Sequence, residues 1–315
     1  MTVKHFFDNN KHVKIGIPNA LLYHTYKVLW LEFFKSLGIE VIVSPETNKQ
    51  IINLGSKNCI DEACFSSKIY IGHVTWLTDK CDMVFVPRYE NTAIREDYCT
   101  RIIGLYDLVR NTFPNIKLLH ADTNYMFRKR EQDAFIKIGE ALGKQHEETL
   151  AAYTNAVEKF KASTKAATDA QTALAKSGGT KVLLVTHSYN SQDSVVGKNV
   201  ADFFKAAGIK ILHANIIDSS IVKEKMRAKY GTRIYWKVNA ELLAGVEHYK
   251  NDVDGIVLLS TFPCGPDSIF NEMIIRQLKD KPVLNLMIDE LNATAGLVTR
   301  LESFTDILEA KRSGA

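Results

Sequence analysis

The chain has 315 residues, of which 46% are hydrophobic and 24% are charged, the balance of an ordinary globular protein with about two domains. Its 40 basic and 36 acidic residues give a net charge of +4, and no cluster of lysine or arginine stands out, so we expect no nucleic-acid partner. The N-terminus has no apolar signal-peptide core, and no segment approaches the ~20 apolar residues of a membrane span. We therefore expect a cytoplasmic protein without membrane contact, whose five cysteines are reduced thiols or metal ligands.

The two halves of the chain repeat one pattern of short, apolar, β-branched runs that alternate with helical segments. Such runs are typical of parallel strands that are buried on both faces. In both halves the first helix ends at a glycine, Gly38 and Gly208, as the position after a helix prefers. The expected strands are residues 13–18, 39–43, 83–86 and 117–119 in the first half, and residues 181–185, 209–212, 255–259 and 282–288 in the second.

This alternation predicts the α/β class, with one doubly wound parallel sheet in each of two domains. We place the first domain at residues 12–130 and the second at residues 180–315. Between them, residues 131–179 predict one or two long helices, which form either a linker packed across both domains or a dimer interface. Their narrow apolar seam is expected to consist of Leu150, Tyr153, Val157, Phe160, Ala167 and Leu174.

Three cysteines stand where a strand or loop leads into a helix. Cys264 follows the strand at 255–259 and precedes a helical pattern, and Cys64 and Cys99 of the first domain stand in similar places. The carboxyl ends of parallel strands form the ligand-binding edge of such sheets. If these three thiols converge, they form a three-thiolate site, which suggests an iron–sulfur cluster with one iron left free.

Other interpretations of the cysteines remain open. A single cysteine in an apolar protein is most often buried filler, which we favour for Cys81. Cys59 is close enough to Cys64 to share a site with it, but the spacing does not require this. Zinc is a rival metal, with His73 or His187 as a fourth ligand, although structural zinc sites usually bring their ligands in closer sequence pairs.

Several polar residues are candidates for contact with a substrate. His187, Tyr189 and Asn190 follow the strand at 181–185, a ligand-facing position. His187 or Tyr189 could donate a proton, and a loop-capping network is the alternative. Arg88 could bind a phosphate or carboxylate, or it could form a salt bridge to an acidic neighbour, Glu90 or Glu96.

Two glutamates lie close to the proposed ligand loops. Glu62 and Glu290 could transfer protons if burial raised their pKa values, and capping of helix amides is the simpler role. No glycine-rich phosphate loop is present, so ATP chemistry is not expected on this chain.

A set of short motifs extends over nearly the whole chain. They are Asp61-Glu62-Ala63-Cys64 with Lys68 and Gly72-His73, Val86-Pro87-Arg88, Cys99 with Gly104-Leu105 and Asp107, Cys264-Gly265-Pro266-Asp267-Ser268, and Asp289-Glu290 with Ala295-Gly296 and Thr299-Arg300-Leu301-Glu302. With these motifs the chain, from residue 14 to residue 308, resembles the 2-hydroxyacyl-CoA dehydratase superfamily, in the branch of acyl-CoA dehydratase activase-related proteins.

The resemblance implies two Rossmann-like domains that flank a four-iron, four-sulfur cluster in the interdomain cleft. Cys64, Cys99 and Cys264 would hold the cluster, and its fourth iron would be open or weakly held and able to bind the substrate carbonyl. In the relatives, an ATP-hydrolysing activator supplies one low-potential electron, which passes to a 2-hydroxyacyl-CoA thioester and leads to loss of hydroxide. Arg88, Asn190 and Asp267 are candidate substrate contacts.

Four functional hypotheses follow from these observations. We favour an enzyme that carries out reductive or radical chemistry on a small substrate such as a 2-hydroxyacyl-CoA. The main alternative is a non-catalytic electron-transfer or cluster-carrying partner of an ATP-dependent activator. A double-cubane-type reductase ranks lower, because six thiolates would be expected and the chain has five cysteines. The last is a zinc-stabilised ligand-binding protein. A homodimer is compatible with each of them.

Overall fold

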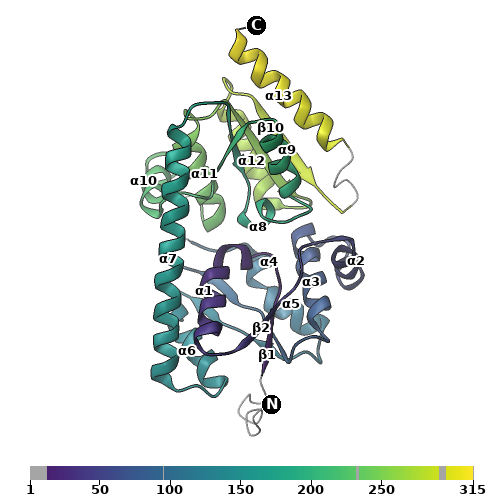
Figure 1. The fold of residues 1–315 in the computed structure, drawn as a ribbon, viewed down its shortest axis with the longest axis vertical. Helices are drawn as coiled ribbons and strands as arrows, with labels where there is room; N and C mark the ends of the chain where they lie inside the picture. The colour runs from purple at the N-terminus through teal and green to yellow at the C-terminus, as the bar shows by residue number, and fades with distance from the viewer. Residues whose placement is uncertain (1–12, 95, 232–233, 291–295, 315) are drawn as a thin grey trace. The chain divides into compact units, whose positions relative to one another are not determined.

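The computed structural model describes residues 13–94, 96–231, 234–290 and 296–314 (Figure 1). The chain forms two compact units. Unit 1 consists of Met1–Asp61 and Ser67–Lys165, and unit 2 consists of Glu62–Ser66 and Ala166–Ala315. The short segment around Cys64 thus belongs to unit 2, although the chain on both sides of it belongs to unit 1. The domain limits expected from the sequence remain a prediction.

Unit 1 is built on a four-stranded parallel sheet in the order β2-β1-β3-β5. Its strands are β1 (Lys14–Ile17), β2 (Glu40–Val43), β3 (Met83–Phe85) and β5 (Leu118–Leu119), and its helices are α1 (Tyr23–Ser36), α2 (Lys49–Asn58), most of α3 (Phe65–Leu77), α4 (Thr100–Ile103), α5 (Leu105–Thr112) and α6 (Glu131–Ala141). Trp30 and Phe34 of α1 each pack edge-on against Phe85 of β3, and Phe33 packs in the same way against Phe135 of α6. This aromatic layer fixes helices α1 and α6 to the sheet.

A second, two-stranded parallel sheet in unit 1 pairs β4 (Arg88–Asn91) with β6 (Asp122–Asn124). The sequence analysis did not predict these strands. Both are short and polar, so they lack the apolar run by which a buried strand is recognised.

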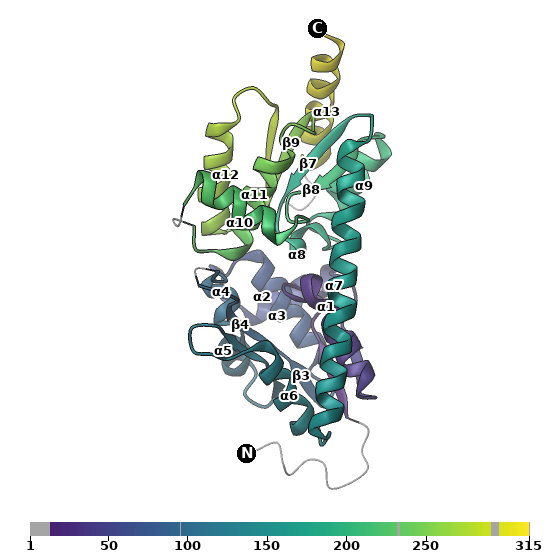
Figure 2. The same ribbon diagram turned by 90° about the vertical axis from the view of Figure 1, so that its left-hand side faces the viewer.

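Unit 2 contains the second four-stranded parallel sheet, in the order β10-β9-β7-β8. Its strands are β7 (Lys181–Val185), β8 (Lys210–His213), β9 (Gly255–Thr261) and β10 (Val283–Ile288), and its helices are α8 (Ser188–Ser191), α9 (Lys198–Ala206), α10 (Ser219–Lys229), α11 (Lys237–Tyr249), α12 (Gly265–Gln277) and α13 (Leu297–Ser313). Helices α11 and α12 lie on one side of the strands and α9 lies on the other (Figure 2).

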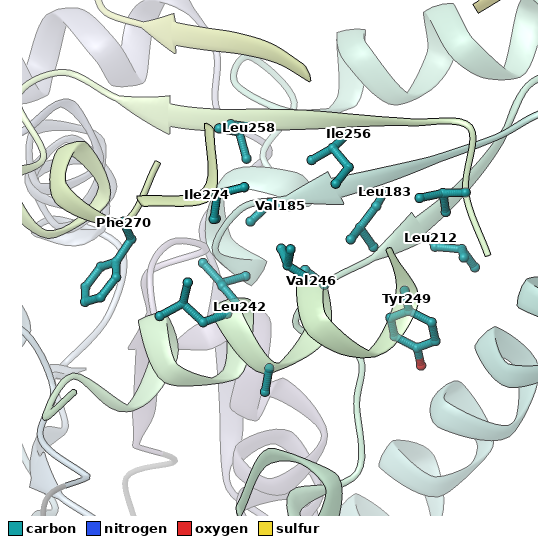
Figure 3. Close-up of a cluster of buried hydrophobic side chains, with 14 of the residues drawn as sticks. Leu183, Val185, Leu212, Leu242, Val246, Tyr249, Ile256, Leu258, Phe270 and Ile274 are labelled. Atoms are coloured by element: carbon teal, nitrogen blue, oxygen red, sulfur yellow. The ribbon is translucent and has the colours of Figure 1, made fainter. Parts of the chain in front are cut away.

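The core of unit 2 fills the space between the sheet and α11 (Figure 3). Alternate residues of β7 and β9, including Leu183 and Ile256, point toward Leu242 and Val246 of the helix, and all four are at most 5% exposed. On the opposite face, a Cβ at Gly255 would lie only 2.7 Å from Leu308 and 2.8 Å from Phe304 of α13. The central strands β7 and β9 are therefore buried on both faces, which explains their nearly continuous apolar runs.

Helix α7 (His146–Lys176) is continuous, and its first part belongs to unit 1 and its last part to unit 2. In unit 1, its buried face is made of small residues, Thr149, Ala152 and Ala156, and Gly139 of α6 packs directly against Thr149. One or two long helices were expected between residues 131 and 179, and the structure has the short α6 followed by the long α7. The expected seam was wrong at Ala167, which is exposed.

All eight strands expected from the sequence are present, with ends that differ by at most two residues. The mixed α/β class with parallel sheets is therefore confirmed. Among the described residues, no helix combines the length and the hydrophobicity that a membrane span requires.

Candidate metal centre

The strand order of unit 2 creates a ligand-binding position at the carboxyl ends of β7 and β9. From β7 the chain first adds β8 on one side and then returns to add β9 on the other. Such a reversal leaves a crevice between the two neighbouring strands, where ligands of open α/β sheets bind. His187 follows β7 by two residues, and Cys264 follows β9 by three.

A buried pair occupies this position. His187 Nε2 lies 2.8 Å from Asp267 Oδ1, and Asn239 Nδ2 of α11 donates to the same oxygen at 3.0 Å. The ring of Tyr189 stacks on His187, with centroids 4.8 Å apart and planes inclined by 6°. Burial alone would raise the pKa of Asp267, but the charge of His187 and the hydrogen bonds from His187 and Asn239 outweigh it and lower the pKa.

Cys264 is the N-cap residue of α12, and its thiol is hydrogen-bonded to the Asp267 side chain. Burial and the negative charge of Asp267 raise the pKa of the Cys264 thiol. Ligand atoms of His187, Cys264 and Asp267 all lie within 4.8 Å of one another. A bound cation would reverse the local electrostatics, because a metal ion deprotonates a coordinating thiol.

Cys64 is fixed beside this group by its chain neighbours. The backbone N–H of Phe65 donates to Phe262 O at 2.9 Å, just beyond the end of β9. Ser66 Oγ donates to Asn190 Oδ1 at 3.1 Å and lies 2.9 Å from Thr261 Oγ1. The charge of Cys64 also contributes to the raised pKa of Cys264, after burial and Asp267. Two of the three candidate thiols thus belong to unit 2.

The five cysteines differ in their positions relative to the nearest helix. Cys64, Cys99 and Cys264 directly precede α3, α4 and α12 respectively. Cys59 stands instead at the C-terminal end of α2. Cys81 donates to Leu77 O at 3.2 Å, and burial raises its pKa to about 11. Cys99 lies in unit 1.

Buried polar atoms next to the pair lack partners within the described residues. They are His187 Nδ1, Asn190 Nδ2 and Thr186 Oγ1, in side chains that are at most 6% exposed. A small cavity of about 10 Å³ lies against Thr186, Asn239 and Asp267, close to the volume that one water molecule requires. Because a buried polar atom without a partner costs free energy, these atoms indicate that a ligand or a water belongs at this position.

A family model for the CoA enzyme activase uncharacterised domain (DUF2229) matches residues 14–217. This match covers more than half of the chain and includes Cys64, Cys99 and His187. The chain belongs to the CoA enzyme activase uncharacterised domain family. Membership confirms the expected relation to activase-related proteins. No curated protein sequence matches the chain.

Solved structures similar to this family member are distant. One is the SBP FpvC from Pseudomonas aeruginosa in complex with Mn2+, at 12% identity, covering 97% of this chain and 100% of that one, with a TM-score of 0.30. Another is a zinc-bound mutant variant of AdcAII from Streptococcus pneumoniae, at 12% identity, covering 95% and 98%, with a TM-score of 0.30. These TM-scores are too low to assign the fold.

The two candidate glutamates of this activase-domain protein are both exposed. Glu62 precedes Cys64 by two residues and makes no hydrogen bond or ion pair with any described residue. Glu290 follows the end of β10 by two residues. Neither is buried enough for the desolvation on which a proton-transfer role would depend.

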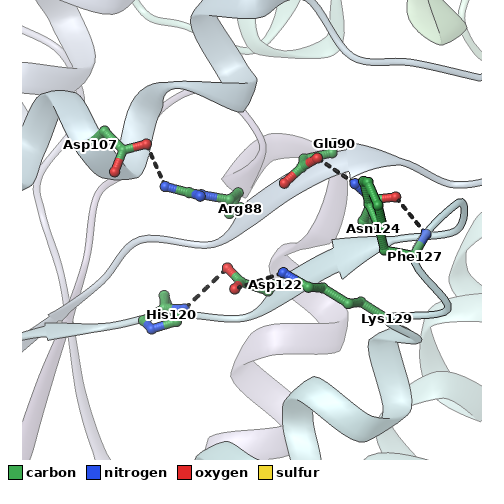
Figure 4. A network of polar contacts seen from close by, with 8 residues as sticks. All are labelled: Arg88, Glu90, Asp107, His120, Asp122, Asn124, Phe127 and Lys129. Carbon is green, nitrogen blue, oxygen red and sulfur yellow. Dashed lines mark hydrogen bonds and ion pairs between the residues drawn. The ribbon is translucent and has the colours of Figure 1, made fainter.

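Two further candidates of the family member lie in unit 1. The Arg88 guanidinium pairs with Asp107 (Figure 4), rather than with Glu90 or Glu96. It also lies 5.2 Å from the ring centroid of Tyr106. His73 has both ring nitrogens hydrogen-bonded, to Ser44 Oγ at 2.9 Å and Thr47 Oγ1 at 3.1 Å. His73 therefore has no free nitrogen for zinc, which leaves His187 as the histidine of that hypothesis.

The sequence analysis did not predict three residues that make hydrogen bonds at the candidate site. Asn239 stands in the first turn of α11, Ser66 in the first turn of α3, and Thr261 at the end of β9. Of these three residues, Thr261 alone could have been predicted from the sequence, because it is the last residue of the strand that leads to Cys264. Asn239 and Ser66 look like ordinary polar helix positions, and only the tertiary fold directs them inward.

Proposed function

We propose that this protein holds a four-iron, four-sulfur cluster through Cys64, Cys99 and Cys264, and that it is a member of the 2-hydroxyacyl-CoA dehydratase superfamily with two Rossmann-like domains. The observation that carries the proposal is that Phe65, next to Cys64, is hydrogen-bonded at 2.9 Å to Phe262 O in the loop that leads to Cys264, beside a buried histidine whose Nδ1 has no partner among the described residues.

The chemistry of the donor set fits such a cluster. Thiolates are the usual ligands of iron–sulfur clusters, and each of the three cysteines precedes a helix, whose N-terminus stabilises negative charge. None of the five cysteines forms a disulfide, which suits the reducing cytoplasm that the sequence suggests. His187 and Asn190 would place polar atoms toward the ligand.

When bound, the cluster supplies low-potential electrons. The chain's own residues hold and shield that position. Asp267 and Tyr189 fix the ring of His187 from two sides, which leaves Nδ1 able to hold a proton or donate a hydrogen bond. We propose reductive or radical chemistry on a CoA thioester, with electrons from an ATP-hydrolysing activator, in keeping with the family's description as a CoA enzyme activase domain.

The test is anaerobic purification with iron supplied, followed by iron and sulfide analysis and electron paramagnetic resonance. We expect about four irons and four sulfides per chain, and we expect Cys264→Ala and Cys99→Ala to lose them. Cys81→Ala is the matched control, because its thiol contacts Leu77 O away from the centre. Iron-free protein, or an iron content unchanged in Cys264→Ala, would overturn the proposal.

A single metal ion is the second candidate function, because ligand atoms of His187, Cys264 and Asp267 lie within 4.8 Å of one another. A nitrogen, a thiolate and a carboxylate are all ligands that zinc accepts. One variant distinguishes a single metal ion from an iron–sulfur cluster. Asp267→Asn should abolish binding of a single zinc ion, and it should leave iron and sulfide bound if the three cysteines hold a cluster.

A further inference from the structure

Unit 1 contains a cavity that the metal centre does not use. Its volume is about 750 Å³, and its walls come from β4, from the turn that follows β6, and from Tyr26 of α1. Pockets for small ligands usually measure about 300–1,000 Å³. The cavity therefore has the capacity for a whole small molecule.

The turn at residues 125–129 that forms one wall is held rigidly. Asn124 is buried, its backbone pairs with Lys129 in both directions, and its Oδ1 accepts from Phe127 N at 3.1 Å (Figure 4). Asn91 Oδ1 accepts from Tyr125 N at 2.7 Å. Arg128 has a φ of 57°, a backbone conformation that is uncommon for residues other than glycine and costs free energy. The wall is thus fixed before any ligand arrives.

The same wall carries an excess of positive charge. Arg128, Lys129 and Arg130 all line the cavity and are exposed. Lys129 is 3.6 Å from Asp122, whereas the side chains of Arg128 and Arg130 form no ion pair or hydrogen bond with any described residue. Two guanidinium groups with all their donors available suit a phosphate group, which they can bind through paired hydrogen bonds.

Apolar and aromatic surface lies beside these cations. Tyr125, Met126 and Ile94 line the cavity and are 55%, 62% and 65% exposed, and exposed apolar side chains that gather in one place mark a contact surface. Deeper in, the rings of Tyr26 and Tyr89 stack with centroids 4.9 Å apart. This surface suits a flat ring.

The interior of the cavity adds polar groups. Thr123 is 7% exposed, and its Oγ1 has no partner among the described residues. Glu131 is the acidic group of the lining, and its two oxygens accept from the hydroxyls of Tyr89 and Tyr153. Both oxygens of Glu131 are therefore already engaged by tyrosine hydroxyls, and Glu131 is less exposed than Arg128.

We propose that this cavity binds a phosphorylated ligand with a planar ring, the chemistry of a nucleoside diphosphate. The phosphates bind Arg128 and Arg130, and the ring lies against Tyr125 and Met126. The proposal is independent of the metal centre, because no residue of that centre lines the cavity.

The test is calorimetric titration of the purified full-length protein with ADP, adenosine and inorganic pyrophosphate. ADP supplies both ring and phosphates, and the other two probes supply one each. We expect ADP to bind at least about tenfold more tightly than either, because both kinds of contact contribute. Absence of ADP binding, or equal binding of pyrophosphate or of adenosine, would overturn the proposal.

Variants of the residues that line the cavity test whether ADP binds there. Arg128→Gln with Arg130→Gln should weaken ADP binding by about tenfold or more. Arg110→Gln with Lys137→Gln is the control, because it removes the same charge from exposed positions outside the cavity. Tyr125→Ala should also weaken ADP binding while leaving pyrophosphate binding unchanged. Equal ADP affinity in the cavity variants and the control would place the ligand elsewhere.

Discussion

His187 Nε2 lies 2.8 Å from Asp267 Oδ1, although the two residues are 80 positions apart in the sequence. The pair joins the ends of β7 and β9, the two strands at which the sheet of unit 2 reverses its order. Both side chains are almost fully buried. Their contact therefore both holds the two loops together and positions the candidate metal centre.

Asp267→Asn should lower the free energy of unfolding by about 1–3 kcal/mol, because it removes a charged acceptor that His187 and Asn239 share in a buried place. Chemical denaturation of the metal-free protein measures the change. Asp202→Asn, at an exposed position on α9, should change stability by less than about 0.5 kcal/mol. Equal stability of the two variants would show that the pair is not structural.

Gln171→Ala should destabilise unit 2 by about 1–3 kcal/mol. Gln171 is buried on α7, and its amide donates to His213 O at 2.7 Å and Ile216 O at 2.6 Å, while its oxygen accepts from His213 N at 2.8 Å. Alanine would leave these backbone groups without partners beside the edge strand β8. Thermal unfolding measures the loss, and Thr172→Ala on the exposed side of the helix serves as the reference. A melting temperature equal to that of the reference would contradict this account.

Gly72→Ala should destabilise unit 1 by at least about 1–3 kcal/mol, as overpacking does. Helices α2 and α3 cross with their backbones in contact, and a Cβ at Gly72 would lie 2.0 Å from Ile51 O. Gly178→Ala is the control, because a Cβ there meets nothing within 4 Å. Denaturant titration compares the two, and tolerance of alanine at residue 72 would rule out the close crossing.

Acid should destabilise the protein through two buried histidines. Burial is the main cause that lowers the pKa of His24 to about 4 and the pKa of His73 to about 3, whereas an unfolded histidine titrates near pH 6.5. Below pH 6.5 the unfolded chain binds protons that the folded chain does not. Stability is therefore full above pH 6.5 and falls toward pH 4, by up to about 1.4 kcal/mol per pH unit for each histidine.

Denaturation at pH 7, 6 and 5 measures this slope. His73→Gln should reduce it, because glutamine takes up no proton and can still bond to Ser44 and Thr47. His146→Gln, at an exposed position, should leave the slope unchanged. A slope that is the same in both variants would show that His73 does not contribute.

The sequence alone predicted the strands of the two main sheets. It did not predict the elements that polar side chains hold in place. The eight strands of the two main sheets were recognisable by their short apolar runs, which are clearest in the central strands β7 and β9, where both faces are buried. Strands β4 and β6 were not, since side chains such as Asn91 and Asn124, rather than apolar burial, hold the turn beside them. Ala167 fits the spacing of the helical seam, yet the middle of α7 is largely exposed, and periodicity alone does not show where packing stops.

The candidate site was partly predictable for the same reason. His187, Asn190 and Cys264 follow predicted strands, so the rule for the carboxyl edge of a parallel sheet indicated all three. The pairing of His187 with Asp267, and the contribution of Asn239 from α11, depend on how the helices pack. Glu62 was a candidate because it is close to Cys64 in sequence, and closeness in sequence does not determine burial.

Because the five residues Glu62–Ser66 belong to unit 2, they limit how the protein can be divided into separately expressed fragments. A fragment that starts at Ala166 would carry Cys264 and the whole sheet of unit 2, but it would lack Cys64 and the hydroxyl that joins Asn190 to Thr261. Because the polypeptide enters unit 2 twice, no single cut separates the two units intact. Expression of the halves as independent proteins should therefore yield a C-terminal fragment with an incomplete centre, which a synthetic peptide covering that short segment could restore.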